Sequence, residues 1–519
     1  MSPAKKTRSL SVRRAISAEL QLRPERELRA IADRVLRIAK SSGIPETEVH
    51  VDEVIDALTR FANNTIHQHV AEHGLTVSLR VVVDGRTARV TTNRIEEDAL
   101  RAALESAASL AASQPKDPGL LPLPAKQKYR TVRRFSPATA SLSADSRARA
   151  VKNTCSLAES KGQIAAGIFS SGQSQSVLAN SRGLFAAYRQ TQAEFSVTMQ
   201  QGSATSWAKA NAADFRAFDP LALAKIANEK APLAENPAEL APGRYTVILE
   251  PAAVLDLVGF LFYDFAATAI QDQRSCFSGR LGKPLLGKNI TITDDVYHPE
   301  QLGAPFDGEG IPRQRVILVD SGVPRNLVYS RRSAKKAGTR PTGHGFALPN
   351  EYGEAPMNLV IGGGKTSVEE MIAGTERGLL VTRLWYIREL DPYEKVMTGM
   401  TRDGLFLVEK GKVSRAVRNF RFNQSILQML KNVEALGPSR RATADDQIHR
   451  RFAVFIRQGE AMACGTHAGF FCRAAGIDEV AGNAAVHEDH ALTGNAFAIE
   501  RRAELFGMVD VVGDGDVFS

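Results

Sequence analysis

The run GLLVTRLWYIR, residues 378–388, decides how the second half of this 519-residue chain is interpreted. Valine, threonine, isoleucine and aromatic residues occur throughout it, a composition that favours a β-strand. Side chains alternate between the two faces of a strand, which would pair Arg383 with Trp385 and Tyr386 with Arg388. The run therefore predicts a strand whose polar and aromatic residues lie on distinct faces.

The segment before this strand, IGGGKTSVEEMI at residues 361–372, looks like a phosphate-binding loop that enters a helix. The phosphate-loop pattern G-x-x-x-x-G-K-S/T needs a glycine five positions before the second one, and Leu359 stands there. Thr366 or Ser367, with a glutamate three residues on, instead matches a helix N-cap and its capping box. The segment therefore favours the start of a helix over a nucleotide site.

Strand and turn signals continue on both sides of these two segments. Turn signals recur at Asp307-Gly308, Arg402-Asp403-Gly404 and Lys410-Gly411. Apolar positions alternate between Met400 and Phe422, as they do in a meander of antiparallel strands. We therefore predict a large antiparallel β-rich domain over residues 236–437.

The first part of the chain has the patterns of two helices and a hairpin. Apolar residues recur at helical spacing from Glu25, and Gly43 closes this helix. Asp84-Gly85 stands between two β-rich runs, which is a strong hairpin signal. The second helix has Leu100, Ala103, Leu104, Ala107 and Leu110 on one face and ends before a proline-rich link. Residues 25–124 are therefore predicted to form an N-terminal α/β domain.

Residues 125–235 are predicted to form a middle α+β domain. A helix near residues 143–161 is followed by strands near residues 163–170 and 185–200. The fold class predicted for the chain is α+β, with N-terminal α/β units followed by a large antiparallel β-rich C-terminal domain. A basic flexible arm, residues 1–24, and an atypical tail, residues 438–519, flank these domains.

Composition indicates an ordinary globular protein of the cytoplasm. Four cysteines are too few for a disulfide framework, and no run of 18 apolar residues suggests a membrane span. Residues 1–40 carry eleven Lys and Arg against four Asp and Glu, but no aromatic residues are interleaved with them. This composition favours a solvated arm over a nucleic-acid-binding one. We therefore expect neither nucleic acid nor membrane as a partner.

Several blocks in consistent order between residues 25 and 437 resemble the TldD/PmbA family. They are Gly74–Asn93, Gly243–Val254, Glu369–Ile372, Gly378–Arg388, Thr401–Gly404 and Val417–Asn423. The resemblance implies a cytoplasmic assembly of two related subunits that cleaves peptides. It also implies that a TldD-like subunit binds zinc through an H-E-x-x-x-H helix and a later cysteine, whereas a PmbA/TldE-like subunit lacks these ligands.

The comparable stretch of this chain, residues 253–266, contains no histidine. Asp256 and Asp264 remain there, but two carboxylates eight residues apart do not replace a face with two imidazoles and a glutamate. We interpret both as exposed or capping carboxylates. The chain thus resembles the PmbA/TldE side, with no cofactor of its own and with zinc expected in a TldD-like partner. A stand-alone homodimer that binds peptides without hydrolysing them is the alternative, and no catalytic residue can be named.

Four residues are candidates for binding a peptide substrate. His344 lies between two glycines in a loop, and the resemblance implies that this region is near a cavity shared by the two subunits. Arg383 and Tyr386 lie on the predicted strand, where a peptide could add as an extra strand. Arg402 belongs to Thr401–Gly404, one of the blocks that resemble the family. A turn histidine and a β-domain core with a polar rim are the alternatives.

The tail combines cysteines and histidines that superficially suggest zinc. Cys464, His467, Cys472, His487 and His490 have a spacing that matches no common zinc finger. By the same resemblance, family members finish with a short apolar strand that closes the β domain, and no such strand is recognisable here. Replacement, divergence or a shifted reading frame could each explain its absence.

Overall fold

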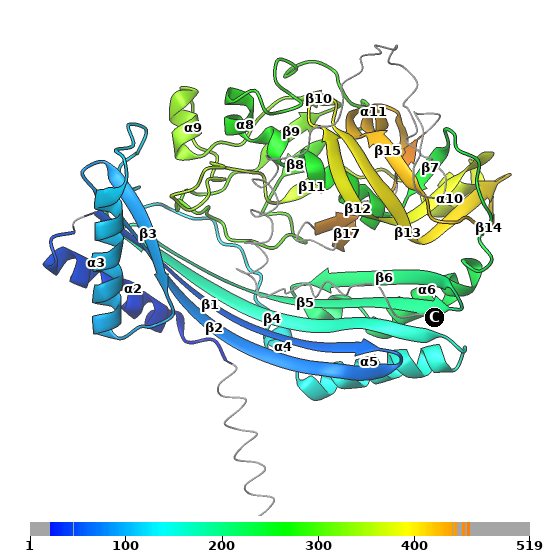
Figure 1. Cartoon of the computed structure of the whole chain (residues 1–519), viewed down its shortest axis with the longest axis horizontal. Helices are drawn as coiled ribbons and strands as arrows, with labels where there is room; N and C mark the ends of the chain where they lie inside the picture. The colour runs from blue at the N-terminus through cyan, green and yellow to red at the C-terminus, as the bar shows by residue number, and fades with distance from the viewer. Residues whose placement is uncertain (1–20, 45, 439, 444–448, 452–453, 457–519) are drawn as a thin grey trace, which may run out of the picture. The chain divides into compact units, whose positions relative to one another are not determined.

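The computed structural model describes residues 21–44, 46–438, 440–443, 449–451 and 454–456. All of them belong to one compact unit, residues 1–472. The α+β fold class is confirmed, because helices and mostly antiparallel sheets alternate along this unit (Figure 1). Among the described residues, no helix is both long enough and apolar enough to cross a membrane.

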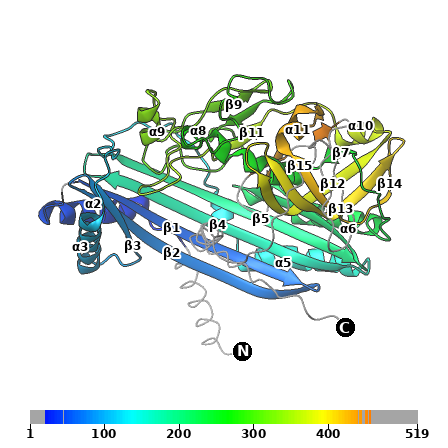
Figure 2. The same cartoon turned by 45° about the horizontal axis from the view of Figure 1, so that its top comes forward.

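Six long antiparallel strands form the N-terminal sheet, in the order β3-β2-β1-β4-β5-β6. They are β1 (Glu46–Ala62), β2 (Thr65–Val83), β3 (Arg86–Thr92), β4 (Ile164–Asn180), β5 (Phe185–Gln201) and β6 (Ala204–Ala212). The predicted hairpin at Asp84-Gly85 is confirmed, and both turn residues have positive φ as a type I′ turn requires. β1 pairs with both β2 and β4, so strands from the two predicted N-terminal domains share one sheet (Figure 2).

Helices cover one face of this sheet. They are α2 (Glu25–Ser41), α3 (Glu97–Ser113), α4 (Pro137–Ala140), α5 (Ala144–Glu159) and α6 (Pro220–Leu233). Alternate strand residues such as Val49 and Val51 are buried in the same apolar cluster as Leu28 of α2 and Leu104 of α3. The predicted face of the second helix was wrong at its end, because Leu110 is 48% exposed and Ala111 is buried instead.

In the described residues, the C-terminal part contains two larger sheets and one pair of short strands. One has the order β14-β13-β12-β7-β19-β16, with β15 beside β13, and the other has the order β10-β9-β8-β11. The first contains β7 (Thr246–Leu249), β12 (Arg377–Asp391), β13 (Val396–Glu409), β14 (Lys412–Ala416), β15 (Arg421–Ser425), β16 (Val433–Leu436) and β19 (Val454–Ile456). The second contains β8 (Ile292–Asp294), β9 (Val316–Asp320), β10 (Val323–Pro324) and β11 (Leu359–Ile361). Among the described strands of these two sheets, only β7 and β12 pair in parallel, so the predicted antiparallel character holds with one exception.

Short helices and two small strands complete the C-terminal part. They are α7 (Pro251–Val258), α8 (Ala267–Gln271), α9 (Arg331–Lys336), α10 (Val368–Ala373), α11 (Ile426–Lys431), β17 (Arg440–Thr443) and β18 (His449–Arg451). The predicted helix entrance is confirmed, since Ser367 caps α10 and forms a capping box with Glu370. Gly364 is required there because a Cβ atom would collide with the Leu436 carbonyl.

Two expectations from the sequence were wrong in this part. A closing strand does follow residue 437, because β19 lies between β7 and β16 and pairs with both in antiparallel fashion. The signal at Asp403-Gly404 is not a turn but a bulge inside β13, with φ of +53° and +123°. Here the two residues lie opposite the single residue Thr382 of β12.

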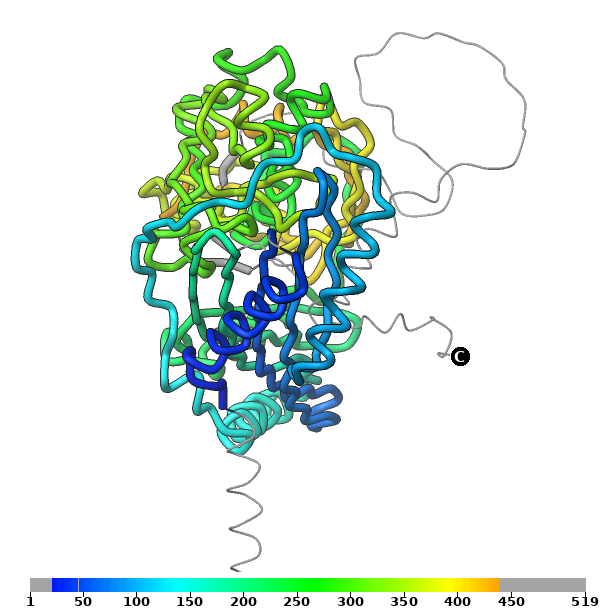
Figure 3. Tube along the Cα trace, turned by 90° about the vertical axis from the view of Figure 1, so that its left-hand side faces the viewer, coloured from blue at the N-terminus to red at the C-terminus, as the bar shows by residue number. Residues whose placement is uncertain are grey.

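The link between α3 and α4 crosses the C-terminal part (Figure 3). Tyr129 donates its hydroxyl to the carbonyl of Gly310, and Arg134 donates to the carbonyls of Gln301 and His298. From the opposite direction, Arg331 donates to the carbonyl of Pro122. The proline-rich link, residues 114–136, therefore ties the N-terminal sheet to the C-terminal loops.

Candidate functional site

The stretch comparable to the family's metal-binding helix is not a single helix. α7 ends at Val258, and two 3₁₀ turns, Gly259–Leu261 and Tyr263–Phe265, follow it. The apolar side chains of α7 point into the C-terminal core, where Val254 and Leu257 are fully buried. The local fold therefore packs this stretch as core structure.

Neither carboxylate of this stretch is exposed, so that expectation was wrong. Asp256 is half-buried and accepts a hydrogen bond from the Leu384 N–H at 3.0 Å. Asp264 is 3% exposed, and its Oδ1 accepts from the Cys276 N–H at 2.8 Å. Asp256 thus ties α7 to β12, and Asp264 ties the following turn to the segment around Cys276.

A lysine ammonium neutralises Asp264. Lys395 Nζ lies 2.5 Å from Asp264 Oδ2 and 2.7 Å from Glu389 Oε1. Burial alone would lower the pKa of Lys395, but the two carboxylates outweigh it and raise that pKa above its ordinary value. Burial, aided by Asp264, also raises the pKa of the Cys276 thiol.

The described residues do not fit a zinc site. Within the part of the chain that the structure describes, no group of three His, Cys, Asp or Glu residues could hold a metal ion. The charge of Asp264 is already matched by Lys395, and no imidazole lies in residues 253–266. The tail residues Cys464 to His490, considered above as ligands, lie outside the described residues.

Three of the four predicted binding residues, Arg383, Tyr386 and Arg402, lie at the β12–β13 hairpin, but they differ in burial. Arg383 is 7% exposed and stacks over the ring of Trp207 of β6 at 4.5 Å, whereas Trp385 is 41% exposed. Strict alternation fails only after Trp385, where β12 is bulged and Tyr386 has a φ of +53°. Arg402 lies directly opposite Arg383 and stacks over Trp385, so Arg383 and Trp385 share the predicted face although only Trp385 is exposed.

The exposed side chains of the hairpin form one continuous surface, which we call the aromatic ridge: Trp385, Tyr386, Arg388 and Arg402. The Arg402 guanidinium lies 4.4 Å from the centre of the Trp385 ring, and Arg388 lies 4.8 Å from that of Tyr386. The two rings are in contact with centroids 5.9 Å apart. Trp, Tyr and Arg are the residue types enriched at the centres of protein interfaces.

Asp403 connects the ridge to the N-terminal sheet. Its carboxylate lies 3.4 Å from the Nε atoms of both Arg383 and Arg402. It also accepts a hydrogen bond from the Thr205 hydroxyl of β6 at 2.8 Å. The bulge at Asp403 turns this buried carboxylate towards all three groups, so the ridge is held by a fixed polar contact.

One edge of β12 carries no neighbouring strand next to the ridge. β7 pairs with β12 only as far as Val381, and Asp256 then satisfies the N–H of Leu384. From there to Asp391, β12 pairs with β13 alone among the described strands. Unpaired strand edges are where extended peptides add as further strands in other proteins.

His344 is not near this hairpin. Its side chain is fully buried, with Nε2 at 2.9 Å from Asp294 Oδ1 and Nδ1 at 2.9 Å from the Thr342 hydroxyl. Burial opposes ionisation of Asp294, but the histidine and Arg313 outweigh it and lower the pKa of Asp294 to about 2. The imidazole thus anchors its loop to β8 and exposes no atom to a ligand.

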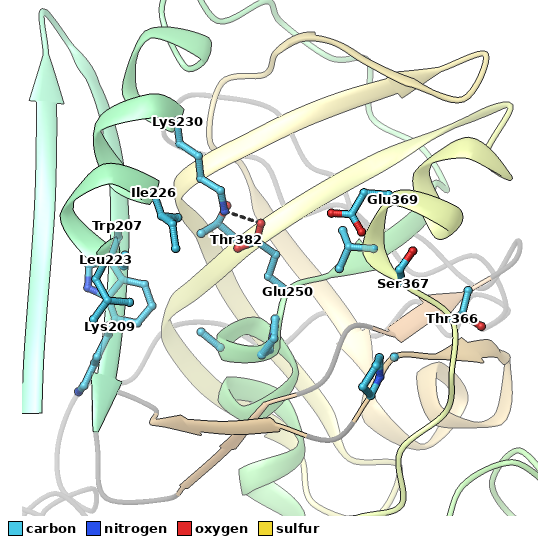
Figure 4. Close-up of a pocket in the computed structure, with 16 residues that line it drawn as sticks. Trp207, Lys209, Leu223, Ile226, Lys230, Glu250, Thr366, Ser367, Glu369 and Thr382 are labelled. Atoms are coloured by element: carbon cyan, nitrogen blue, oxygen red, sulfur yellow. Dashed lines mark hydrogen bonds and ion pairs between the residues drawn. The ribbon is translucent and has the colours of Figure 1, made fainter. Parts of the chain in front are cut away.

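A pocket that the sequence did not predict lies between the middle and C-terminal domains (Figure 4). It has a volume of about 310 Å³ and is bordered by Trp207 and Ile226 on one side and by α10 on the other. Lys230 and Glu250 form an ion pair of 2.6 Å in its wall. Thr382, the β12 residue opposite the bulge, is 1% exposed, and its hydroxyl has no hydrogen-bond partner among the described residues. Trp207 lines the pocket and stacks on Arg383. Arg383 in turn shares Asp403 with Arg402 of the ridge, so the pocket lies beside the ridge.

Comparison with known proteins agrees with the arrangement of domains. Three domain profiles match: the PmbA/TldA metallopeptidase domain 1 at residues 48–111, the central domain at residues 121–234 and the C-terminal domain at residues 242–457. TldE from Thermococcus kodakarensis has the same fold, with a TM-score of 0.76 and 21% identity, and the likeness covers 84% of this chain and 100% of that one.

Curated relatives match over shorter stretches. An uncharacterized protein of Methanocaldococcus jannaschii is 34% identical over 130 residues, which are 24% of this chain and 30% of the relative. The metalloprotease PmbA of Escherichia coli is 26% identical over 208 residues, or 39% of this chain and 43% of the relative. The matched stretches thus span less than half the length of these relatives. Together with the three domain profiles and the shared fold, they establish that the chain belongs to the PmbA/TldD family.

Proposed function

We propose that this chain is the non-zinc subunit of a cytoplasmic two-subunit peptidase, in which a TldD-like partner supplies the zinc. The observation that carries the proposal is the ion pair between Lys395 and Asp264. An ammonium group provides the positive charge in the stretch that the family resemblance associates with metal binding. A metal ion there would have to displace a buried lysine from two carboxylates, which is costly.

In this proposal the chain contributes substrate binding to the shared site. An extended peptide would add to the open edge of β12 through backbone hydrogen bonds, which select for extended conformation and not for sequence. Tyr386 and Arg402 of the aromatic ridge would contact its side chains. Arg383 is a positioning residue, because it touches Trp207 and Asp403 and holds the hairpin against β6.

The test is reconstitution with a chain that carries H-E-x-x-x-H. We expect the two chains to co-purify, zinc to be stoichiometric only when the partner is present, and an unstructured peptide to be cleaved only by the mixture. A chelator should abolish that cleavage. Stoichiometric zinc in the isolated chain, or chelator-sensitive cleavage by it alone, would contradict the proposal.

A homodimeric peptide-binding protein without hydrolytic activity is the second candidate. It is favoured by the aromatic ridge, which offers a binding surface regardless of any zinc-bearing partner. Size-exclusion chromatography of the chain with and without a TldD-like chain separates the two candidates. Homodimers that bind peptide but never engage the partner would favour the second.

A further inference from the structure

A second cavity lies between the N-terminal sheet, the proline-rich link and the C-terminal loops. Its volume is about 520 Å³, within the range of sites that bind small ligands. Its walls include Thr87 of β3, Asp117 and Leu120 of the link, and Glu309, Leu348 and Tyr352 of the C-terminal loops. The cavity is remote in sequence from the β12–β13 hairpin and shares none of its lining residues with the pocket of Figure 4.

Glu309 is a buried carboxylate in this wall with few partners. It is 5% exposed, and its Oε2 accepts a hydrogen bond from the Arg331 N–H at 2.9 Å. No described residue donates to Oε1, and no described cation forms an ion pair with the carboxylate. Gly345 allows the close approach, since a Cβ atom there would collide with Oε2.

The neighbouring carboxylate takes most of the available donors. Asp307 accepts hydrogen bonds from the N–H groups of Glu309, Ile311 and Gly345. Glu309 is therefore left with one backbone donor while a second carboxyl group lies two residues away. Burial, and then Asp307, raise the pKa of Glu309 to about 7, although Arg331 and Arg80 oppose this rise.

The cations near the cavity have other partners. Arg332 pairs with Asp117, Arg80 pairs with Glu48, and Arg331 donates to the Pro122 carbonyl. Glu351, on the exposed rim, adds another negative charge. The wall thus has an excess of carboxylates over cations that could neutralise them.

We propose that this cavity binds an organic ammonium group with an apolar substituent, and that the Glu309 carboxylate is its counter-ion. An ammonium needs only one buried carboxylate, and Leu120, Leu348 and Tyr352 supply apolar and aromatic surface for the substituent. A metal ion would need more ligands, and no group of three suitable residues occurs in the described part of the chain. All the lining residues come from this chain, so the site needs no partner subunit. A failure of this proposal would therefore leave the proposed peptidase role untouched, and the reverse also holds.

The first experiment compares charge at constant shape. Isopentylamine and its neutral analogue isopentanol are titrated into the full-length chain by calorimetry at pH 7. We expect the amine to bind at least about tenfold more tightly, which corresponds to about 1.4 kcal/mol. Glu309→Gln should abolish this preference, while Glu105→Gln, at an exposed carboxylate of α3 outside the cavity, should retain it.

The pH dependence tests the role of Glu309 directly. The probe stays protonated because an alkylamine has a pKa close to that of lysine, about 10.4. Binding requires the ionised carboxylate, so the wild-type chain should bind the amine about tenfold more tightly at pH 8 than at pH 6. Glu309→Gln should bind equally weakly at both values.

A final pair of probes distinguishes the source of the ammonium. Binding of leucine amide, but not of N-acetyl leucine amide, would assign the site to the amino termini of peptides. Binding of isopentylamine alone would assign it to small amines. Equal affinity for the amine and the alcohol, unchanged binding in Glu309→Gln, or no saturable binding up to about 10 mM would overturn the proposal.

Discussion

Glu48 on the N-terminal sheet and Glu309 in the cavity wall are the same residue type at nearly the same burial, yet their pKa values move in opposite directions. Burial disfavours the charge of both. Glu48 overcomes it through Arg80, whose guanidinium donates at 3.2 Å, and Arg89, which donates at 2.6 Å. Glu309 has no such cation. Burial therefore makes a carboxylate structural or available to a ligand depending on whether the fold supplies its counter-ion.

The largest effect is expected where the counter-ions are lost. Glu48→Gln leaves the buried Arg80 guanidinium and its neighbour Arg89 without their anion, so we expect the free energy of unfolding at pH 7 to fall by about 3 kcal/mol. Glu309→Gln at pH 8 should instead raise it by about 2 kcal/mol, because glutamine is neutral where burial disfavours the ionised Glu309. Urea unfolding of both variants tests this, and equal losses would break the comparison.

A smaller effect is expected from pH. The pKa of Glu309 is about 7 in the folded chain and near the ordinary value of 4.5 in the unfolded chain. Between pH 4.5 and pH 7 the folded state therefore binds more protons than the unfolded state. Stability should therefore fall as pH rises from 5 to 8, by about 2 kcal/mol from this residue. Thermal or urea unfolding across that range measures it, with Glu309→Gln as the control that removes the decline.

Glu48 should give the opposite pH dependence. Its pKa lies well below the ordinary value because Arg80, His50 and Arg89 outweigh its burial. Its contribution to stability is present above pH 4.5 and is lost as pH falls below that value. A difference between wild type and Glu48→Gln that does not shrink on acidification would argue against the assigned partners.

A cation placed in the cavity should lower the pKa of Glu309 and so reduce its difference from that of Glu48. Leu121 lines the same cavity as Glu309, and Leu121→Lys would bring an ammonium group near that carboxylate. We expect the pKa of Glu309 to fall by about one unit, or about 1.4 kcal/mol. The midpoint of the pH-dependent stability change measures it, and Leu121→Met serves as the uncharged control. A midpoint that stays near pH 7 would show that the wall cannot accommodate a counter-ion.

The smallest effect is expected for a charge pair near solvent. Arg402 pairs with Asp403, but its side chain is 43% exposed. Arg402→Met should lower stability by no more than about 0.5 kcal/mol, because water screens the pair and the Trp385 contact is partly kept. The same variant should weaken peptide binding at the aromatic ridge, which fluorescence of Trp385 can follow. If Arg402→Met lowered the free energy of unfolding as much as Glu48→Gln does, exposure to solvent would not explain the difference between the two ion pairs.

Local signals in the sequence predicted local structure well. The helical spacing from Glu25 and the N-cap at Ser367 depend on residues within one or two turns, and both features occur where expected. Asp84-Gly85 likewise forms its hairpin, because the turn chemistry suffices to reverse the chain. These elements needed no information from distant parts of the chain.

Features set by distant contacts escaped prediction. Asp403-Gly404 has the same turn signal as Asp84-Gly85, but pairing with β12 makes it a bulge. Glu309 follows another such signal, Asp307-Gly308, which is typical of an exposed loop. In the structure Glu309 is buried and accepts a hydrogen bond from the Arg331 N–H, a contact between residues distant in sequence. The sequence predicted the strand of Arg383 but not its burial, because the stacking partner Trp207 belongs to a distant strand.

The open edge of β12 also bears on how this chain behaves at high concentration. An unpaired strand edge can join any other strand of suitable conformation, including that of another copy, and so favours aggregation. The left-handed residue Tyr386 interrupts the regular row of backbone groups, and Arg388 places a charge beside it. A flat strand cannot pair regularly along this bend and would desolvate Arg388, so the irregularity that obscured the sequence pattern also disfavours pairing between copies.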